Sequence, residues 1–135
     1  MLEEIKKDKR GIFVTLTFSN EKLSELGKQV LKTNDEYIFN NQIATLAVRR
    51  FLGRWRKRHK KSVKHFLITE LGHKNTERIH LHGIIFTEHR DDIELIWNYG
   101  YVWLGTFVNE RTVNYIIKYI SKVDLDHKNY KPKIL

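Results

Sequence analysis

Two apolar stretches, "KHFLITEL" (64–71) and "RIHLHGIIF" (78–86), decide how this chain folds. Both are rich in β-branched and aromatic residues, and only "GHKNTE" (72–77) separates them. This pattern predicts two strands joined by a hairpin. Because side chains alternate between the two faces of a strand, His80 and His82 point to the same face. The hairpin therefore presents two imidazoles side by side.

Two histidines in this arrangement are suited to hold a metal ion. Their Cα atoms are about 6.6 Å apart, so both rings can reach one ion. Glu70 is the expected third ligand if the hairpin pairs it with His80, whereas a slip of one residue would turn it to the opposite face. Two imidazoles and one carboxylate leave positions for water and substrate. The alternatives are histidines hydrogen-bonded to their neighbours and a solvated carboxylate at a strand end.

The remaining segments predict an α+β domain around this hairpin. Residues 20–36 are ambiguous between a short helix and a loop, because Gly27 is unfavourable inside a helix. The other expected elements are a strand over 11–19, helices over 37–59 and 91–98, a strand over 100–108 and a last helix over 109–122. This order is typical of a mainly antiparallel sheet with helices packed on one face. We expect one domain over 1–135.

Composition narrows the class of function. The 135 residues contain no cysteine, which excludes disulfides, thiolate zinc sites and a cysteine nucleophile. No run approaches the ~18 apolar residues of a membrane span, and the N-terminus has no signal-peptide core, so we expect no membrane association and a cytoplasmic protein. Lys and Arg outnumber Asp and Glu by 25 to 16, and the net charge is +9. Such a basic balance favours a nucleic-acid partner.

The last predicted helix carries a second group of chemically competent residues. Tyrosines and lysines recur there at helical spacing, away from the apolar stripe: Tyr115, Lys118, Tyr119 and Lys122. An adjacent ammonium favours the phenolate form of a tyrosine, and a divalent ion on a phosphate makes its phosphorus more electrophilic. The pattern therefore predicts a tyrosine nucleophile that forms a phosphotyrosine linkage. The alternative is an amphipathic helix rim.

A basic segment, "RRFLGRWRKRHKKSVKH" (49–65), ends the long predicted helix. It is a candidate surface for DNA phosphates, with strongly salt-dependent binding. The alternative is a solvated charged face. The candidate DNA-binding residues are Arg49, Arg50, Arg54, Arg56, Lys57 and Arg58. The aromatic residues Trp97, Tyr99, Tyr101 and Trp103 are candidates for stacking on single-stranded bases, with core packing as the alternative for most of them.

Three motifs resemble those of HUH endonucleases, in order and in spacing: "FVTLTFS", "ERIHLHGIIF" and "YIIKYISK". HUH endonucleases are replication initiators, relaxases and transposases that nick single-stranded DNA through tyrosine. The two-tyrosine form, with "ITELG" before the histidines and "IWNYGYVWLGTF" after them, most resembles initiators of microvirus-type single-stranded DNA phages. The resemblance covers roughly residues 12–122. Members of the family are usually longer, so the chain is either an excised catalytic domain or a compact variant.

The resemblance implies a ferredoxin- or RRM-like sheet with the histidines on a central strand. His80, His82 and Glu70 would hold one Mn²⁺ or Mg²⁺ ion, although the histidines would also accept Zn²⁺. Tyr115 or Tyr119 would attack a phosphodiester at a single-stranded or hairpin origin, leaving a 5′-phosphotyrosine and a 3′-OH that primes rolling-circle synthesis.

The same resemblance implies that the other tyrosine acts after one round of synthesis. Lys118 and Lys122 would stabilise phenolate or phosphate charge. Because the sequence contains no GxxxxGK[ST] motif, a host helicase and a host polymerase are the expected partners in a bacterial cell.

Three other functions remain open from the sequence. The first is an HUH transposase, plasmid initiator or relaxase, because some transposases also carry two tyrosines. The second is a non-catalytic RRM-like module that binds nucleic acid, which explains the charge but not the paired histidines or the Tyr/Lys spacing. The third is a metal-dependent hydrolase that uses activated water. The oligomeric state does not follow from the sequence.

Overall fold

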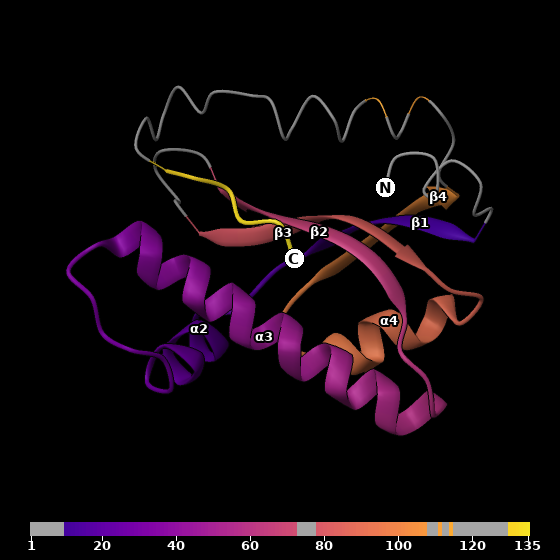
Figure 1. Cartoon of the computed structure of the whole chain (residues 1–135), viewed down its shortest axis with the longest axis horizontal. Coiled ribbons are helices and arrows are strands. Elements are labelled where there is room, and N and C mark those ends of the chain that lie inside the picture. Colours follow the sequence, from indigo (N-terminus) through magenta and orange to yellow (C-terminus); the bar gives the residue numbers. More distant parts are fainter. Residues whose placement is uncertain (1–9, 73–77, 108–110, 112–113, 115–129) are drawn as a thin grey trace.

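The computed structural model describes residues 10–72, 78–107, 111, 114 and 130–135. Within them, four antiparallel strands form one sheet in the order β2-β3-β1-β4, and three helices pack beside it (Figure 1). The strands are β1 (Gly11–Leu16), β2 (Lys64–Leu71), β3 (Ile79–Phe86) and β4 (Val102–Phe107); the helices are α2 (Asn20–Gly27), α3 (Glu36–His59) and α4 (Arg90–Trp97). This α+β architecture is compatible with the ferredoxin-like fold, and β3, which carries both histidines, is a central strand.

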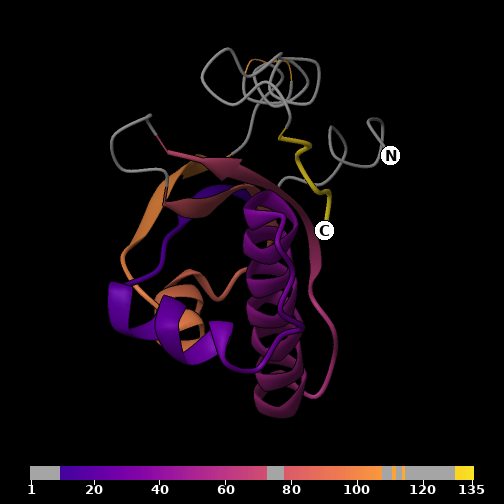
Figure 2. The same cartoon turned by 90° about the vertical axis from the view of Figure 1, so that its left-hand side faces the viewer.

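All three helices cover the same face of the sheet (Figure 2). Alternation along the strands explains this, because every second side chain of β1, Ile12, Val14 and Leu16, is buried in the main core. Phe51 of α3 and Trp97 of α4 belong to the same core. The intervening side chains of each strand lie on the other face, which we call the open face because none of the three helices covers it.

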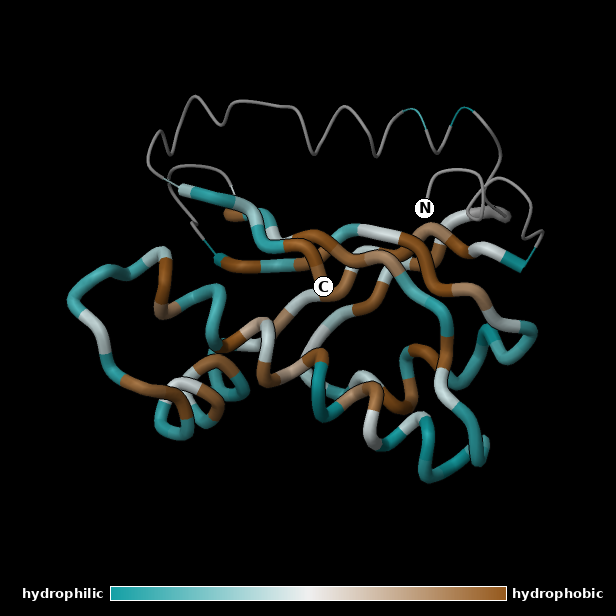
Figure 3. Tube along the Cα trace, in the orientation of Figure 1, coloured by the Kyte–Doolittle hydropathy of each residue, from teal (hydrophilic) through white to brown (hydrophobic). Residues whose placement is uncertain are grey.

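Local signals explain where α3 begins and ends. The Asp35 side chain accepts hydrogen bonds from the backbone N–H groups of Tyr37 and Ile38, as an N-cap does. Lys60 ends the helix in the left-handed conformation, with φ of 62°. The exposed C-terminal end of α3 is hydrophilic (Figure 3). The helix predicted over 37–59 is confirmed.

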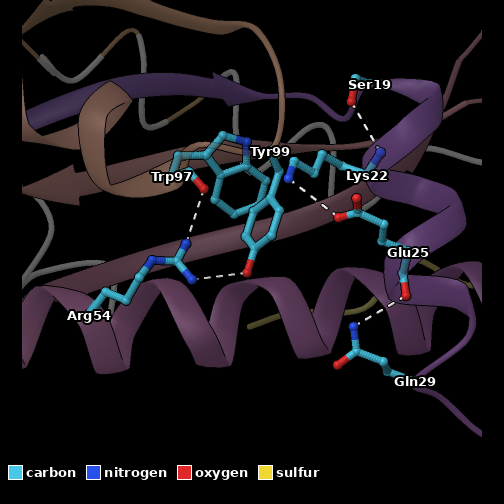
Figure 4. Close-up of polar contacts among 7 residues, drawn as sticks. All are labelled: Ser19, Lys22, Glu25, Gln29, Arg54, Trp97 and Tyr99. Carbon is cyan, nitrogen blue, oxygen red and sulfur yellow. Dashed lines mark hydrogen bonds and ion pairs between the residues drawn. The ribbon is translucent and has the colours of Figure 1, made fainter.

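The ambiguous segment 20–36 contains one short helix, α2. Ser19 accepts a hydrogen bond from the N–H of Lys22 at its start, and Gly27 is its last residue (Figure 4). Gly27 therefore marks the end of the helix and does not interrupt it. Lys22 also pairs with Glu25 at 3.3 Å on the outer side of α2.

The edge of β2 is covered by the end of the chain. Leu67 and Leu135 exchange two backbone hydrogen bonds, at 3.0 and 2.7 Å, and Ile134 forms a bridge with Ile68. The Tyr130 hydroxyl lies 2.6 Å from the Thr69 hydroxyl oxygen. The sequence shows no periodicity in this tail, so its pairing with the sheet is a finding of the structure.

Most of the other predicted boundaries hold within two residues. The strand over 64–71 is confirmed, and those over 78–86 and 100–108 are observed as β3 and β4. The helix over 91–98 is α4. The predicted helix over 109–122 lies outside the described residues except for Arg111 and Asn114, which are helical. None of the described helices is long and apolar enough to cross a membrane.

Candidate metal centre

The register between β2 and β3 places all three predicted ligands on the open face. Glu70 pairs directly with His80, and Ile68 pairs with His82. Gly83, the next residue of β3, allows the close approach of the two strands, because a Cβ atom there would clash with the Phe66 carbonyl oxygen. The pairing assumed from the sequence is therefore the observed one.

The ligand atoms of these side chains converge on one point. The Nε2 atoms of His80 and His82 are 3.0 Å apart, and Glu70 Oε2 lies 2.9 Å from His82 Nε2 and 3.6 Å from His80 Nε2. Ligands held about 2.1 Å from a shared ion, at right angles to each other, are themselves roughly 3 Å apart. The three groups therefore have the spacing of ligands to one ion.

Hydrogen bonds on the far side of each ring orient the imidazoles. His80 Nδ1 lies 3.2 Å from the carbonyl oxygen of Arg78, which can only accept, so we assign the proton to Nδ1. The lone pair of His80 Nε2 then points toward Glu70 and His82. His82 Nδ1 lies 3.0 Å from the Thr15 hydroxyl oxygen on β1. Such outer contacts hold metal-binding histidines in position.

The charge distribution also fits a cation. Burial by itself raises the pKa of Glu70, but hydrogen bonds and charge from His80 and His82 outweigh it and lower this pKa to about 2. Glu70 is therefore a carboxylate at neutral pH.

A second observation concerns the proton between the rings. With His80 Nε2 as the acceptor, the Nε2–H of His82 can donate to it at 3.0 Å. The buried Glu70 Oε2 atom is then left without a hydrogen-bond partner, although it lies within ion-pair distance of His82. A divalent ion in place of that proton would satisfy all three ligand atoms. The residues present therefore fit a metal ion.

One other group of this kind exists among the described residues, and the sequence analysis missed it. His59 Nε2 at the end of α3 lies 2.9 Å from Asp92 Oδ2 on α4, and the rings of His59 and His89 stack at 4.3 Å. Arg58 already pairs with the same Asp92 oxygen at 3.3 Å. Stacked rings and a bound guanidinium make this group a clasp between α3 and α4. No signal within either segment predicts the contact, because the residues are about 30 positions apart.

The structure does not bring the basic segment to the metal centre. Its candidate residues lie on α3, on the helix side of the sheet. Arg54 donates hydrogen bonds to the carbonyls of Ile96 and Trp97, where α4 ends, and to the Tyr99 hydroxyl (Figure 4). Arg58 pairs with Asp92.

The other basic candidates are exposed. Arg50 donates to the Gln29 side chain. Arg49, Arg56 and Lys57 are exposed on α3.

The remaining candidates divide into two sets. Tyr115, Lys118, Tyr119 and Lys122 lie outside the described residues. Among the aromatic candidates, Trp97 is buried and Tyr99 is half-buried against the core, whereas Tyr101 and Trp103 are exposed. Core packing thus accounts for two of the four aromatic residues.

Comparison with known families identifies the chain's relationship. The family described as replication-associated protein ORF2 matches residues 11–124. The chain belongs to this family. The match includes β1, the β2–β3 hairpin with its three ligands, and the segment with both tyrosines. No curated protein and no solved structure matches the chain. Membership of the ORF2 family confirms the expected relationship to replication proteins at that level.

Proposed function

We propose that this chain is a two-tyrosine HUH endonuclease that nicks and rejoins single-stranded DNA at a replication origin, as initiators of microvirus-type phages do. The observation that carries the proposal is the convergence of Glu70, His80 and His82 on the open face, with an unsatisfied carboxylate oxygen at its centre. Membership of a replication-associated family supports the same role.

The metal centre would bind the scissile phosphate. Mn²⁺ or Mg²⁺ is the proposed ion, because oxygen-rich substrates favour it, and when bound it would neutralise charge on the phosphate oxygens. Glu70 supplies the negative charge that holds the cation. Arg78 and Thr15 keep the two rings turned toward it.

The nucleophile in this proposal is Tyr115 or Tyr119. Its phenolate oxygen attacks phosphorus, and the bond from phosphorus to the 3′ oxygen breaks. The 5′-phosphate remains on tyrosine, and the departing oxygen takes a proton to become a 3′-OH. Lys118 and Lys122 would favour the phenolate and balance phosphate charge. These roles rest on the sequence spacing of the four residues.

The second tyrosine would repeat the reaction after one round of synthesis. It would attack the regenerated origin, and the freed 3′-OH would then attack the first phosphotyrosine and close a circle. Rolling-circle replication in a bacterial cytoplasm, with a host helicase and polymerase, is the setting we propose.

The direct test is capture of the covalent intermediate. A pool of single-stranded oligonucleotides with a randomised region, labelled at the 3′ end, is incubated with the protein and Mn²⁺ and separated under denaturing conditions. A 5′-phosphotyrosine keeps the 3′ label on the protein, whereas a 5′ label leaves with the released fragment. We expect an adduct that EDTA prevents and that the double substitution Tyr115→Phe and Tyr119→Phe abolishes.

A matched pair of histidine variants tests the metal centre. His80→Ala should abolish the adduct and lower Mn²⁺ affinity at least tenfold by calorimetry, on the order of a lost ligand contact. His89→Ala, in the clasp between α3 and α4, should change neither. Cleavage by the double tyrosine variant would instead favour a hydrolase that activates water. Binding of DNA without any adduct would favour the non-catalytic module.

A further inference from the structure

Strand β4 carries two exposed aromatic side chains beside the candidate metal centre. Tyr101 is 69% exposed and Trp103 is 47% exposed, whereas the other two tryptophans, Trp55 and Trp97, are buried. Both exposed residues alternate with the buried Val102, so they belong to the open face. Large exposed aromatic residues near a substrate site are candidates for contact with that substrate.

The Trp103 ring is held in place along its strand. It meets the Phe13 ring edge-on, with centroids 5.9 Å apart. Its outer end lies over Gly105, where an added Cβ would come within 3.0 Å of the indole. The absence of a side chain at position 105 lets the indole pack close to β4, and nearly half of its surface remains accessible.

This ring is continuous with the metal centre. Thr15 pairs with His82 on one side and with Trp103 on the other. The Phe13 ring stacks against His82 at 6.2 Å and also contacts Trp103. Trp103 is therefore only two ring contacts away from a metal ligand, on the same face.

The two edges of the sheet differ in what they offer to a bound strand. The β2 edge is occupied by residues 133–135. At β4, Arg90 donates hydrogen bonds to the carbonyls of Leu104 and Gly105, which places a guanidinium at that edge. A nucleotide chain leaving the metal centre toward β4 thus meets both aromatic rings and positive charge, in a protein of net charge +9.

We propose that Trp103, with Tyr101 beside it, stacks on an unpaired base adjacent to the phosphodiester held at Glu70, His80 and His82. Stacking would fix the position of the scissile phosphate and would select single-stranded over paired DNA, because a paired base does not offer its face to a side chain. It would tolerate most sequences, since every base has a π-face. This inference rests on the proposed function.

The test uses tryptophan fluorescence in EDTA, so that binding is measured without cleavage. Because Trp103 is the one exposed tryptophan, a short oligothymidylate should quench mainly its emission. Trp103→Ala should weaken binding of this oligonucleotide by about 5- to 150-fold and remove the quenching. Trp103→Phe, which keeps an aromatic face, should retain most of the affinity. Leu95→Ala, which removes an exposed apolar side chain of α4, should have no effect.

Two further arms decide between the possible outcomes. Equal quenching by a duplex of the same length would overturn the stacking proposal in favour of general electrostatic binding. Unchanged affinity and nicking in Trp103→Ala would also overturn it while leaving the nickase intact. Conversely, Trp103-dependent quenching without any covalent adduct in Mn²⁺ would contradict the nickase and retain the stacking surface. Tyr101→Ala, which spares the contact with Phe13, should weaken binding in the same direction.

Discussion

At the scale of single residues, the orientation of the His82 ring depends on a neighbour from another strand. The Thr15 hydroxyl lies 3.0 Å from His82 Nδ1, and Thr15 pairs with His82 across β1 and β3. No metal-binding motif includes this threonine, since it is 67 positions away from the histidine. Its contribution would be to hold the ring so that Nε2 faces Glu70.

We expect Thr15→Val to weaken Mn²⁺ binding by about 10- to 100-fold, the usual effect of losing an outer contact to a ligating histidine. Valine keeps the shape of the side chain and removes only the hydroxyl. Thr15→Ser should restore the affinity, which a purely steric effect would not do. Thr17→Val is the matched control, because that hydroxyl donates to the Tyr101 carbonyl and does not contact either ring. Calorimetric titration with Mn²⁺ measures all three variants.

At the scale of elements, the β2–β3 ladder depends on the absence of a side chain at position 83. An added Cβ would lie 2.8 Å from the Leu67 Cα and would clash with the backbone of Phe66, which cannot yield as a flexible side chain does. Gly83 stands directly after His82, so any shift of the ladder there would also move the ligands.

We expect Gly83→Ala to lower the free energy of unfolding by about 1–3 kcal/mol, the usual cost of overpacking. The same substitution at Gly53 should have the opposite effect. Gly53 lies within α3, where an added Cβ meets nothing within 4 Å, so alanine should raise the free energy of unfolding by about 0.5–1 kcal/mol. Urea denaturation measures both changes. Equal destabilisation by the two alanines would show that the strand contact has no special role.

At the scale of the whole molecule, the sheet separates two chemically different faces. The candidate metal centre and the exposed aromatic residues lie on the open face, and the basic end of α3 lies on the helix side (Figure 2). Any role of the basic residues in DNA binding would therefore be exerted away from the reacting phosphate. Binding strength and chemistry should then be separable by mutation.

We expect the triple substitution Arg49→Ala, Arg56→Ala and Lys57→Ala to weaken DNA binding mainly at low salt. Each lost phosphate contact should reduce the slope of log K against log salt by about 0.7 for a single strand. The yield of covalent adduct at saturating DNA should remain unchanged, because none of these residues lies near the ligands. A lost adduct with unchanged binding would contradict this separation. Binding measured at several salt concentrations, beside the adduct assay, decides the outcome.

Local patterns predicted a large share of the fold. The alternation of Val14, Leu16 and Phe18, the apolar stripe of α3 and the two hairpin stretches all reappear as elements with nearly the predicted bounds. These signals are reliable because they depend on neighbours in the chain. By contrast, the pairing of residues 133–135 with β2 and the contact of Arg54 with the end of α4 join distant segments, and no local pattern encodes them.

The sequence by itself determined that His80 and His82 share one face, because alternation along a strand is a property of the backbone. It left the place of Glu70 open, since a slip of one residue would have reversed that side chain. Only the tertiary structure decided the register, where Gly83 lets β2 and β3 approach closely, and supplied Thr15 and Arg78 as supports of the rings. It also placed the basic end of α3 behind the sheet, because a helix must turn its apolar stripe to the core and its charges to water.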